Sequence, residues 1–292
     1  MKYNLARSRK AQYISLLLPG LALFTVGVIL PAILGLRYSF TSWNGFTKEV
    51  PWNGLENYKK IFSDTKVRDA WKFTLLFTFW NTIIQNLFAL LFALMLNSGI
   101  KAKAVFRTML FIPCLISPVI VGFIWQRIFM NVLPSLNTIF GTHINFLLLG
   151  RSETVLSGVL LANNWQWIGY WMLIYLAALQ TIPKYLYEAA EIDGASKLTR
   201  FRVVTLPMLA PAFTISIVGI TIGSLKVYEL LLSATNGGPG RASTSIIFLI
   251  YNTAISGRQY GYGSAISMTL IFVLLIIAAV QIRILRKREI QL

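Results

Sequence analysis

Polar and aromatic side chains recur at helical spacing inside the long apolar segments of this chain. Asn81 and Gln85 are one helical turn apart and so share a face. Aromatic planes stack on sugar rings, and amides hydrogen-bond to sugar hydroxyls, so this combination is suited to holding a sugar-like solute. The residues that we predict to contact such a solute are Asn81, Gln85, Asn163, Trp165, Tyr170, Lys226, Tyr228, Glu229 and Asn252.

Each of these residues also has a structural interpretation. Tryptophans near a membrane surface form interfacial belts, and Asn and Gln side chains hold membrane helices together. Lys226 and Glu229 have the spacing of an ion pair at a span end. Intramembrane polar groups are costly to expose to lipid, so under either interpretation they face protein or water. The sequence leaves both interpretations open.

Catalytic and nucleotide-binding motifs are missing from the sequence. His143 is the only histidine and Cys114 the only cysteine, so the count excludes a zinc site built from His and Cys. No G-x-S-x-G nucleophile motif and no G-x4-G-K-[ST] phosphate loop occurs. Gly237-Gly-Pro-Gly240 lacks the Lys-Ser/Thr of a phosphate loop, so we interpret it as a tight turn. We therefore expect no enzymatic activity, and no cofactor or metal, on this chain.

Composition indicates an integral membrane protein with an all-α fold. The 292 residues are 56% hydrophobic and 13% charged, about half the charged share of a soluble domain. A spanning helix needs ~20 apolar residues. After a basic N-terminal tail at 1–12, we predict a single transmembrane domain over 13–292, with about six spans at residues 13–40, 73–96, 108–129, 154–181, 207–232 and 263–285. Pro113 and Pro118 are expected to break the third of these spans.

The net charge of +17 is carried mainly by short loops and tails beside apolar segments. That placement indicates control of membrane topology and contact with anionic lipid, rather than binding to nucleic acid. The positive-inside rule puts both termini and the loop at 182–206 in the cytoplasm. The loop holding Lys59 on the opposite side is also basic, so the bias is incomplete.

The loop at 182–206 is both charged and patterned. Ala189 and Ala190 favour a helix, and Asp193-Gly194 is a helix-stop and turn signal. A second short helix is expected to follow, and Pro207 suits the first turn of the next long helix. An ordinary solvated loop is the alternative.

This loop resembles the EAA loop of the permease subunits of binding-protein-dependent ABC importers. The resemblance is carried by Glu188-Ala-Ala-Glu-Ile-Asp-Gly-Ala195, by Phe201 and by Leu206-Pro207. Stretches at 54–62, 225–243 and 261–267 resemble sugar-type permeases of the maltose and glycerol-3-phosphate kind. In the second of these stretches, Tyr228 and Glu229 replace the usual Phe and Asp.

The resemblance implies a type I importer permease fold in a bacterial or archaeal cell membrane. It also implies half of a translocation pathway for a sugar or oligosaccharide, with a second related permease, two ATPase subunits that bind ATP and Mg²⁺, and an extracellular solute-binding protein as partners. Glu188 would pair with a basic residue of the ATPase. The residues implied in this coupling are Glu188, Ala189, Ala190, Asp193, Gly194, Ala195, Phe201 and Pro207. A passive channel and a membrane-embedded enzyme are the alternatives.

Overall fold

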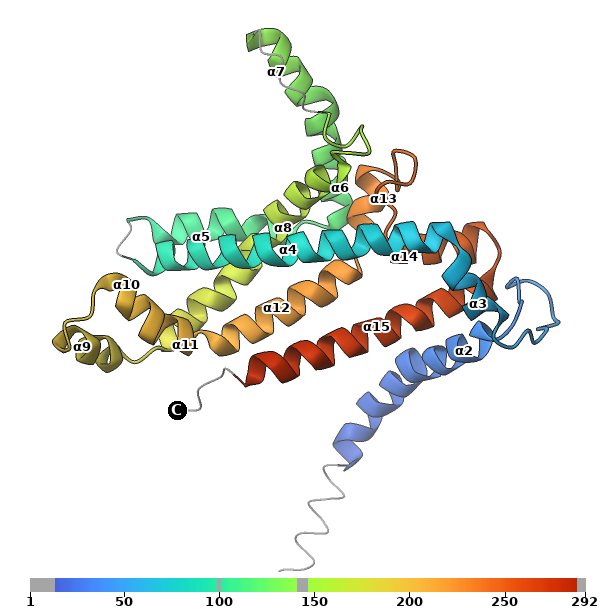
Figure 1. Ribbon diagram of the computed structural model, residues 1–292, viewed down its shortest axis with the longest axis horizontal. Coiled ribbons are helices and arrows are strands. Elements are labelled where there is room, and N and C mark those ends of the chain that lie inside the picture. Colours follow the sequence, from blue (N-terminus) through green and yellow to red (C-terminus); the bar gives the residue numbers. More distant parts are fainter. Residues whose placement is uncertain (1–13, 99–100, 141–146, 288–292) are drawn as a thin grey trace, which may run out of the picture. The chain divides into compact units, whose positions relative to one another are not determined.

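The computed structural model describes residues 14–98, 101–140 and 147–287, and these are helical with connecting turns (Figure 1). The predicted N-terminal tail at 1–12 and His143 lie outside the described residues. Within the described ranges no β-strand occurs, and the one isolated bridge joins Thr41 and Trp52. The chain divides into two compact units, residues 1–63 with 250–270, and residues 64–249 with 271–292.

The first unit contains an apolar helix at Ile14–Ser39, which includes the π segment η1 (Thr25–Ile29) and α2 (Leu30–Ser39). It also contains α3 (Glu56–Ser63), the π segment η5 (Asn252–Ser256) and the start of α15 (Tyr260–Arg286). Gly261 N donates to Trp43 O at 2.9 Å, so the start of α15 is tied to the connector between α2 and α3.

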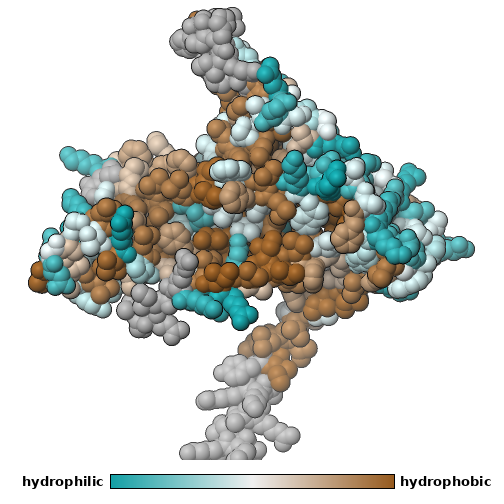
Figure 2. Space-filling model, in the orientation of Figure 1, coloured by the Kyte–Doolittle hydropathy of each residue, from teal (hydrophilic) through white to brown (hydrophobic). Residues whose placement is uncertain are grey.

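In the second unit, α4 (Thr65–Asn97), α8 (Val155–Thr181) and α12 (Ala210–Leu225) pack on one another. Asp64 starts α4 because its side chain accepts from Lys66 N at 2.8 Å, which satisfies an otherwise unpaired amide. Ala89 and Ala93 are fully buried one turn apart, and such small residues let helix backbones approach closely. Outward-facing residues of α4 are large and apolar, such as Phe79 and Leu87. Figure 2 shows apolar side chains over much of one face of the molecule.

Two stretches of this unit are bent rather than straight. Lys103–Leu115 and Pro118–Ser135 meet at 101°, with Ile116 and Ser117 between them. The predicted breaks of the third span at Pro113 and Pro118 agree with this bend, because proline removes a helix amide and constrains the preceding residue. The helix continues through the π segment η3 (Ile128–Val132) into α7 (Leu133–Phe140), where we expected a loop.

The second bend, of 64°, separates Lys197–Met208 from Ala210–Leu225. Pro207 therefore does not begin the next long helix, as we expected. It lies in the short α11 (Leu206–Met208), and Pro211 occupies the first turn of α12 instead. The predicted start of this helix was wrong because Pro207 and Pro211 are equally suited to a first turn. The bend between them buries Leu209, and this packing could not be predicted from the local sequence.

Among the described residues, three helices are long and apolar enough to cross a membrane, or up to five if each bent pair counts as one span. They are Ile14–Ser39, Thr65–Asn97 and Tyr260–Arg286, with the two bent pairs described above. The 27-residue α8 does not reach the same hydropathy, because Asn163, Asn164 and Gln166 lie within it. The membrane boundaries of the individual spans stay predictions.

Candidate functional site

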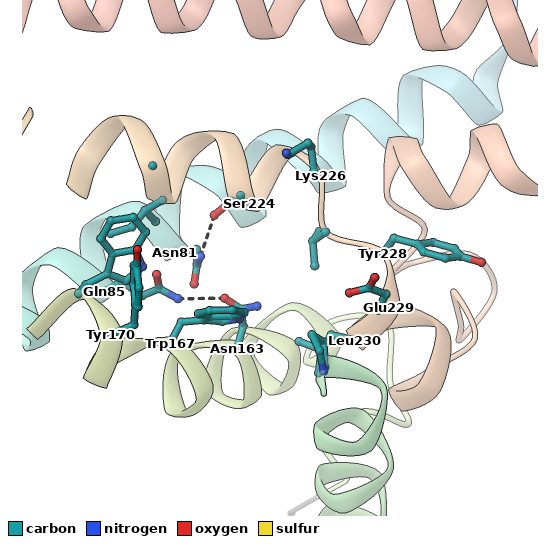
Figure 3. A pocket seen from close by; sticks show the side chains of 16 residues that line it. Asn81, Gln85, Asn163, Trp167, Tyr170, Ser224, Lys226, Tyr228, Glu229 and Leu230 are labelled. Atoms are coloured by element: carbon teal, nitrogen blue, oxygen red, sulfur yellow. Dashed lines mark hydrogen bonds between the residues drawn. The ribbon is translucent and has the colours of Figure 1, made fainter. Parts of the chain in front are cut away.

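The polar residues predicted from spacing converge on one cavity of about 350 Å³ in the second unit (Figure 3). α4 contributes Asn81 and Gln85, α8 contributes Asn163 and Tyr170, and the chain after α12 contributes the rest. Seven of the nine predicted residues line this cavity: Asn81, Gln85, Asn163, Tyr170, Lys226, Tyr228 and Glu229.

Amide side chains form the floor of the cavity and are already partly bonded to one another. Asn81 Nδ2 donates to Ser224 Oγ at 2.7 Å, and Gln85 Nε2 donates to Asn163 Oδ1 at 3.0 Å. Asn164 Nδ2 donates to Asn81 Oδ1 at 3.0 Å and to Leu160 O at 2.7 Å. These bonds hold the three helices together, as the structural interpretation expected. They also fix the orientation of the amides that line the cavity.

The chain unwinds beside the cavity, and the predicted fifth span at 207–232 is therefore not one continuous helix. α12 ends at Leu225, and three residues separate it from α13 (Glu229–Ala234). Ser245 Oγ donates to Val227 O at 2.6 Å and so satisfies a carbonyl that the break leaves unpaired. Gly223 and Ser224 form the turn at this break, since Lys226 N donates to Gly223 O and Val227 N to Ser224 O, but helical periodicity alone did not reveal it.

Lys226 and Glu229 lie on either side of the break, and both are exposed at the cavity. Among the described residues neither side chain makes an ion pair, so the pairing considered from their spacing is not formed in this structure. Lys226 also follows the C-terminus of α12, where a positive charge is favourable to the helix dipole.

Aromatic rings form the wall of the cavity on the side of α8. Tyr170 is nearly perpendicular to both neighbouring indoles, with centroids 6.2 Å from Trp167 and 5.0 Å from Trp171. Gly219 of α12 faces Trp171, and a Cβ atom at Gly219 would overlap the end of that indole. The cavity thus presents aromatic faces next to amide groups.

Two predicted residues lie elsewhere. Trp165 lines an apolar groove of about 560 Å³ between α4, α5 (Lys103–Phe111), α6 (Pro118–Arg127) and α8. It is two residues from Trp167, so its ring points from a different face of the helix. Asn252 belongs to the first unit and is exposed in η5.

Other lining residues were not in the predicted set. They are mainly the small residues of α12 and two indoles of α8: Gly219, Gly223, Ser224, Trp167 and Trp171. The four-residue spacing of the glycines was the available signal, because small residues at i and i+4 leave room on one helix face.

The loop at 182–206 forms the helix–turn–helix that its residues predict. α9 (Lys184–Ile192) ends at Asp193, and Gly194 has φ +76°, the left-handed conformation that glycine favours. Ala195 N donates to Ala190 O at 2.9 Å and closes the turn. Ser196 then caps α10 (Lys197–Arg200) by accepting from Thr199 N at 3.2 Å. We refer to residues 184–200 as the hairpin.

One side of the hairpin is anchored to the helices, and the other is open. Leu186, Tyr187 and Ala190 pack against a buried cluster that includes Val204 and Leu209. Tyr187 Oη lies 3.0 Å from Thr205 Oγ1. On the open side Ile192 is 87% exposed, and the exposed carboxylate of Glu188 makes no ion pair among the described residues.

The described residues contain no group of three or more His, Cys, Asp or Glu side chains placed to hold a metal ion. The cavity and the hairpin are two features of the second unit that have an arrangement suited to function.

Comparison with known proteins identifies the family. Residues 85–288 match the family described as binding-protein-dependent transport system inner membrane component. The chain is 35% identical over 276 residues to the probable starch degradation products transport system permease protein AmyD of Thermoanaerobacterium thermosulfurigenes, covering 94% of both. It is 33% identical over 290 residues to the trehalose/maltose transport system permease protein MalF of Thermococcus litoralis, covering 97% of this chain and 96% of the relative.

Solved structures agree on the fold. A chain of a bacterial ABC transporter involved in import of the acidic polysaccharide alginate superposes with a TM-score of 0.84. The superposition covers 98% of this chain and 99% of that chain, at 24% identity. The same transporter type, in complex with an alginate pentasaccharide-bound periplasmic protein, gives a TM-score of 0.80 at 23% identity, with 94% and 93% covered. The chain therefore has the type I ABC importer permease fold and belongs to the family of binding-protein-dependent transport system inner membrane components.

Proposed function

We propose that this chain forms half of the translocation pathway of an ATP-driven importer for a sugar or oligosaccharide. The substrate class is supported by the relatives, whose names specify starch degradation products and trehalose or maltose. Membership of a transport family favours this function over a membrane-embedded enzyme, and the hairpin favours it over a passive channel, which needs no motor.

The observation that carries the substrate class is the pairing of aromatic and amide groups in the cavity. Tyr170, Trp167 and Trp171 offer ring faces and edges, and Asn81, Gln85 and Asn163 offer amides. Gln85 Oε1 and Asn163 Nδ2 take no part in the bond between these two amides, and both side chains line the cavity. An acceptor and a donor are thus available to sugar hydroxyls, while the rings exclude water from the sugar face.

We propose that the hairpin is the contact for an ATPase subunit, which binds ATP and Mg²⁺. Its open side combines an exposed apolar side chain, Ile192, with the exposed carboxylate of Glu188. When a charge pair is buried at such an interface, removal of one partner destabilises the complex by several kcal/mol, because the other charge is left unpaired. A second related permease, a second ATPase subunit and an extracellular solute-binding protein would complete the importer, with both termini of this chain in the cytoplasm.

The contacts within the second unit support transmission from the hairpin to the cavity. The hairpin continues through the π segment η4 (Phe201–Thr205) and α11 into α12, whose last turn holds Ser224 against Asn81. Midway along, Tyr175, Ser216 and Asn86 bond to one another at 2.6–2.7 Å and join α8, α12 and α4. Reversing a 1:99 population of two states needs roughly 5.5 kcal/mol of differential binding. The contacts between the hairpin and the cavity must therefore be rigid enough to transmit this free energy.

The experiment is uptake by the reconstituted complex in proteoliposomes with its binding protein. Labelled maltodextrins, a monosaccharide and an amino acid are offered in parallel, and ATP hydrolysis is measured alongside. We expect ATP-dependent uptake of at least one saccharide and none of the amino acid. Accumulation of the amino acid but of no saccharide would contradict the substrate class, and uptake without ATP would contradict the motor.

A further inference from the structure

The first apolar helix of the first unit is long enough for its C-terminal end to leave the hydrocarbon of a bilayer. Ile14–Ser39 has 26 residues, and no residue of its most apolar 18-residue window is buried in the structure. At 1.5 Å per residue its length is about 39 Å, which exceeds the ~30 Å hydrocarbon thickness of a bilayer. If this helix spans the bilayer, we expect Ser39, at its C-terminal end, to lie in the headgroup region.

α3 is held directly across this helix end (Figure 1). Asn57 Nδ2 lies 2.8 Å from both Ser39 O, the last carbonyl of α2, and Thr41 O, which follows the helix. Ser39 Oγ and Tyr58 Oη are 2.7 Å apart. These bonds are part-buried or buried, so α3 is positioned at the same depth as Ser39.

Aromatic rings gather at the same level. Tyr38 stacks on Trp43 with centroids 4.6 Å apart, and Phe40 stacks on Trp52 at 5.4 Å. Trp43 also contacts Tyr260, the first residue of another apolar helix, at 5.7 Å. Trp and Tyr are enriched where membrane hydrocarbon meets water, so this cluster independently marks the boundary.

The surface of α3 has three distinct faces. Asn57 and Ile61, four residues apart, form the packed face and are 7% and 8% exposed. Glu56 and Ser63 lie on a polar exposed face. Leu55, which precedes the helix, and Phe62 are seven residues apart and share a third face, 60% and 91% exposed. Leaving such apolar side chains in water is unfavourable.

We propose that α3 is an interfacial membrane helix whose Leu55–Phe62 face inserts into the boundary between headgroups and acyl chains. Lys59 lies between these two residues along the helix. Its exposed ammonium group is 2.9 Å from Glu56 Oε1, so the charge is directed to the polar face of α3, which faces the headgroups in this proposal. The occupant of the face is lipid, because α3 is held at the depth where the first span leaves the hydrocarbon. The helix fixes the depth of that span end.

The experiment places a fluorescent probe on α3 in the full transport complex. Cys114 is the only cysteine, so a Cys114→Ser background accepts single labels. Phe62→Cys carries an NBD probe, and Ser63→Cys, the next residue on the polar face, is the matched control. The complex is reconstituted in nanodiscs of phosphatidylethanolamine and phosphatidylglycerol, with and without lipids carrying a nitroxide near the top of the acyl chain.

We expect the probe at Phe62 to be quenched roughly threefold more strongly than the probe at Ser63, with blue-shifted emission. Leu55→Cys on the same face repeats the measurement if Phe62→Cys does not assemble. Equal quenching at both faces overturns the proposal. A water-like probe at Phe62 that becomes shielded only when the extracellular binding protein is added also overturns it, and assigns the face to protein docking. The readout does not depend on transport, so its failure is distinguishable from failure of the proposed function.

Discussion

Gly219 of α12 lies directly against the indole of Trp171 on α8, with no room between them for a side chain. A Cβ atom at Gly219 would overlap Cη2 of Trp171, whereas one at Gly223, a turn further along the same helix, would meet nothing within 4 Å. Both glycines line the cavity. The pair therefore separates the effect of displacing the indole from the general effect of a glycine replacement in α12.

Gly219→Ala is expected to displace Trp171 and to destabilise the helix packing by about 1–3 kcal/mol. Substrate-stimulated ATP hydrolysis of the reconstituted complex should fall, because the aromatic wall of the cavity moves. Gly223→Ala is the control and should retain near-normal stimulation. Equal losses in the two variants would show that the contact with Trp171 does not shape the cavity.

Tyr170→Ala is expected to weaken the response to substrate without preventing assembly. The ring is 42% exposed at the cavity, so its removal leaves little buried void. We expect the lost aromatic contact to weaken substrate binding by about 1 kcal/mol. Half-maximal stimulation of ATP hydrolysis should then need a roughly fivefold higher substrate concentration.

Trp165→Ala is the matched control, because Trp165 is similarly exposed, at 40%, on the same helix but lines the separate apolar groove. It should leave the half-maximal concentration unchanged. If Trp165→Ala shifts the response and Tyr170→Ala does not, the groove rather than the cavity is the solute path.

Glu188→Ala is expected to uncouple ATP hydrolysis from transport while the protein still inserts into the membrane. Its carboxylate is exposed and makes no ion pair among the described residues, so little intrinsic stability depends on it. Co-purification of the ATPase subunit and the ratio of solute transported to ATP hydrolysed are the measurements.

Glu191→Ala in the same hairpin is the control. Glu191 pairs with Arg200 at 2.9 Å, and its own side chain is 68% exposed, so we expect the pair to contribute no more than about 1 kcal/mol. We expect a nearly normal transport ratio for this variant. Coupling that survives Glu188→Ala but not Glu191→Ala would point to the internal ion pair instead of an ATPase contact.

Gly194→Leu is expected to weaken coupling through the backbone alone. The residue has φ +76°, and nothing lies within 4 Å of the position of an added Cβ, so the cost is the left-handed conformation itself, about 1–2 kcal/mol. Gly194→Asn tolerates that conformation better and should restore most of the activity. Uptake in proteoliposomes distinguishes them, and full uptake by the leucine variant would remove the turn from the coupling path.

The hairpin was predictable because its determinants are local. Ala189 and Ala190 favour a helix, and Asp193-Gly194 stops it, whatever the rest of the chain does. Apolar length likewise indicated membrane helices, and the prolines at 113 and 118 indicated a bent third segment. These features depend on backbone conformation over a few residues, which the residue types themselves constrain.

The cavity was only partly predictable, because it depends on which helices are neighbours. Helical spacing put Asn81 and Gln85 on one face, but only packing placed Ser224, 143 residues away along the chain, against Asn81. Spacing also could not separate Trp165 from Trp167, although the packing of α8 directs one to the groove and the other to the cavity. Composition and turn chemistry thus determined the class of protein and the hairpin. The tertiary structure decided the break after Leu225 and the membership of the cavity, because long-range contacts outweigh local helical preference there.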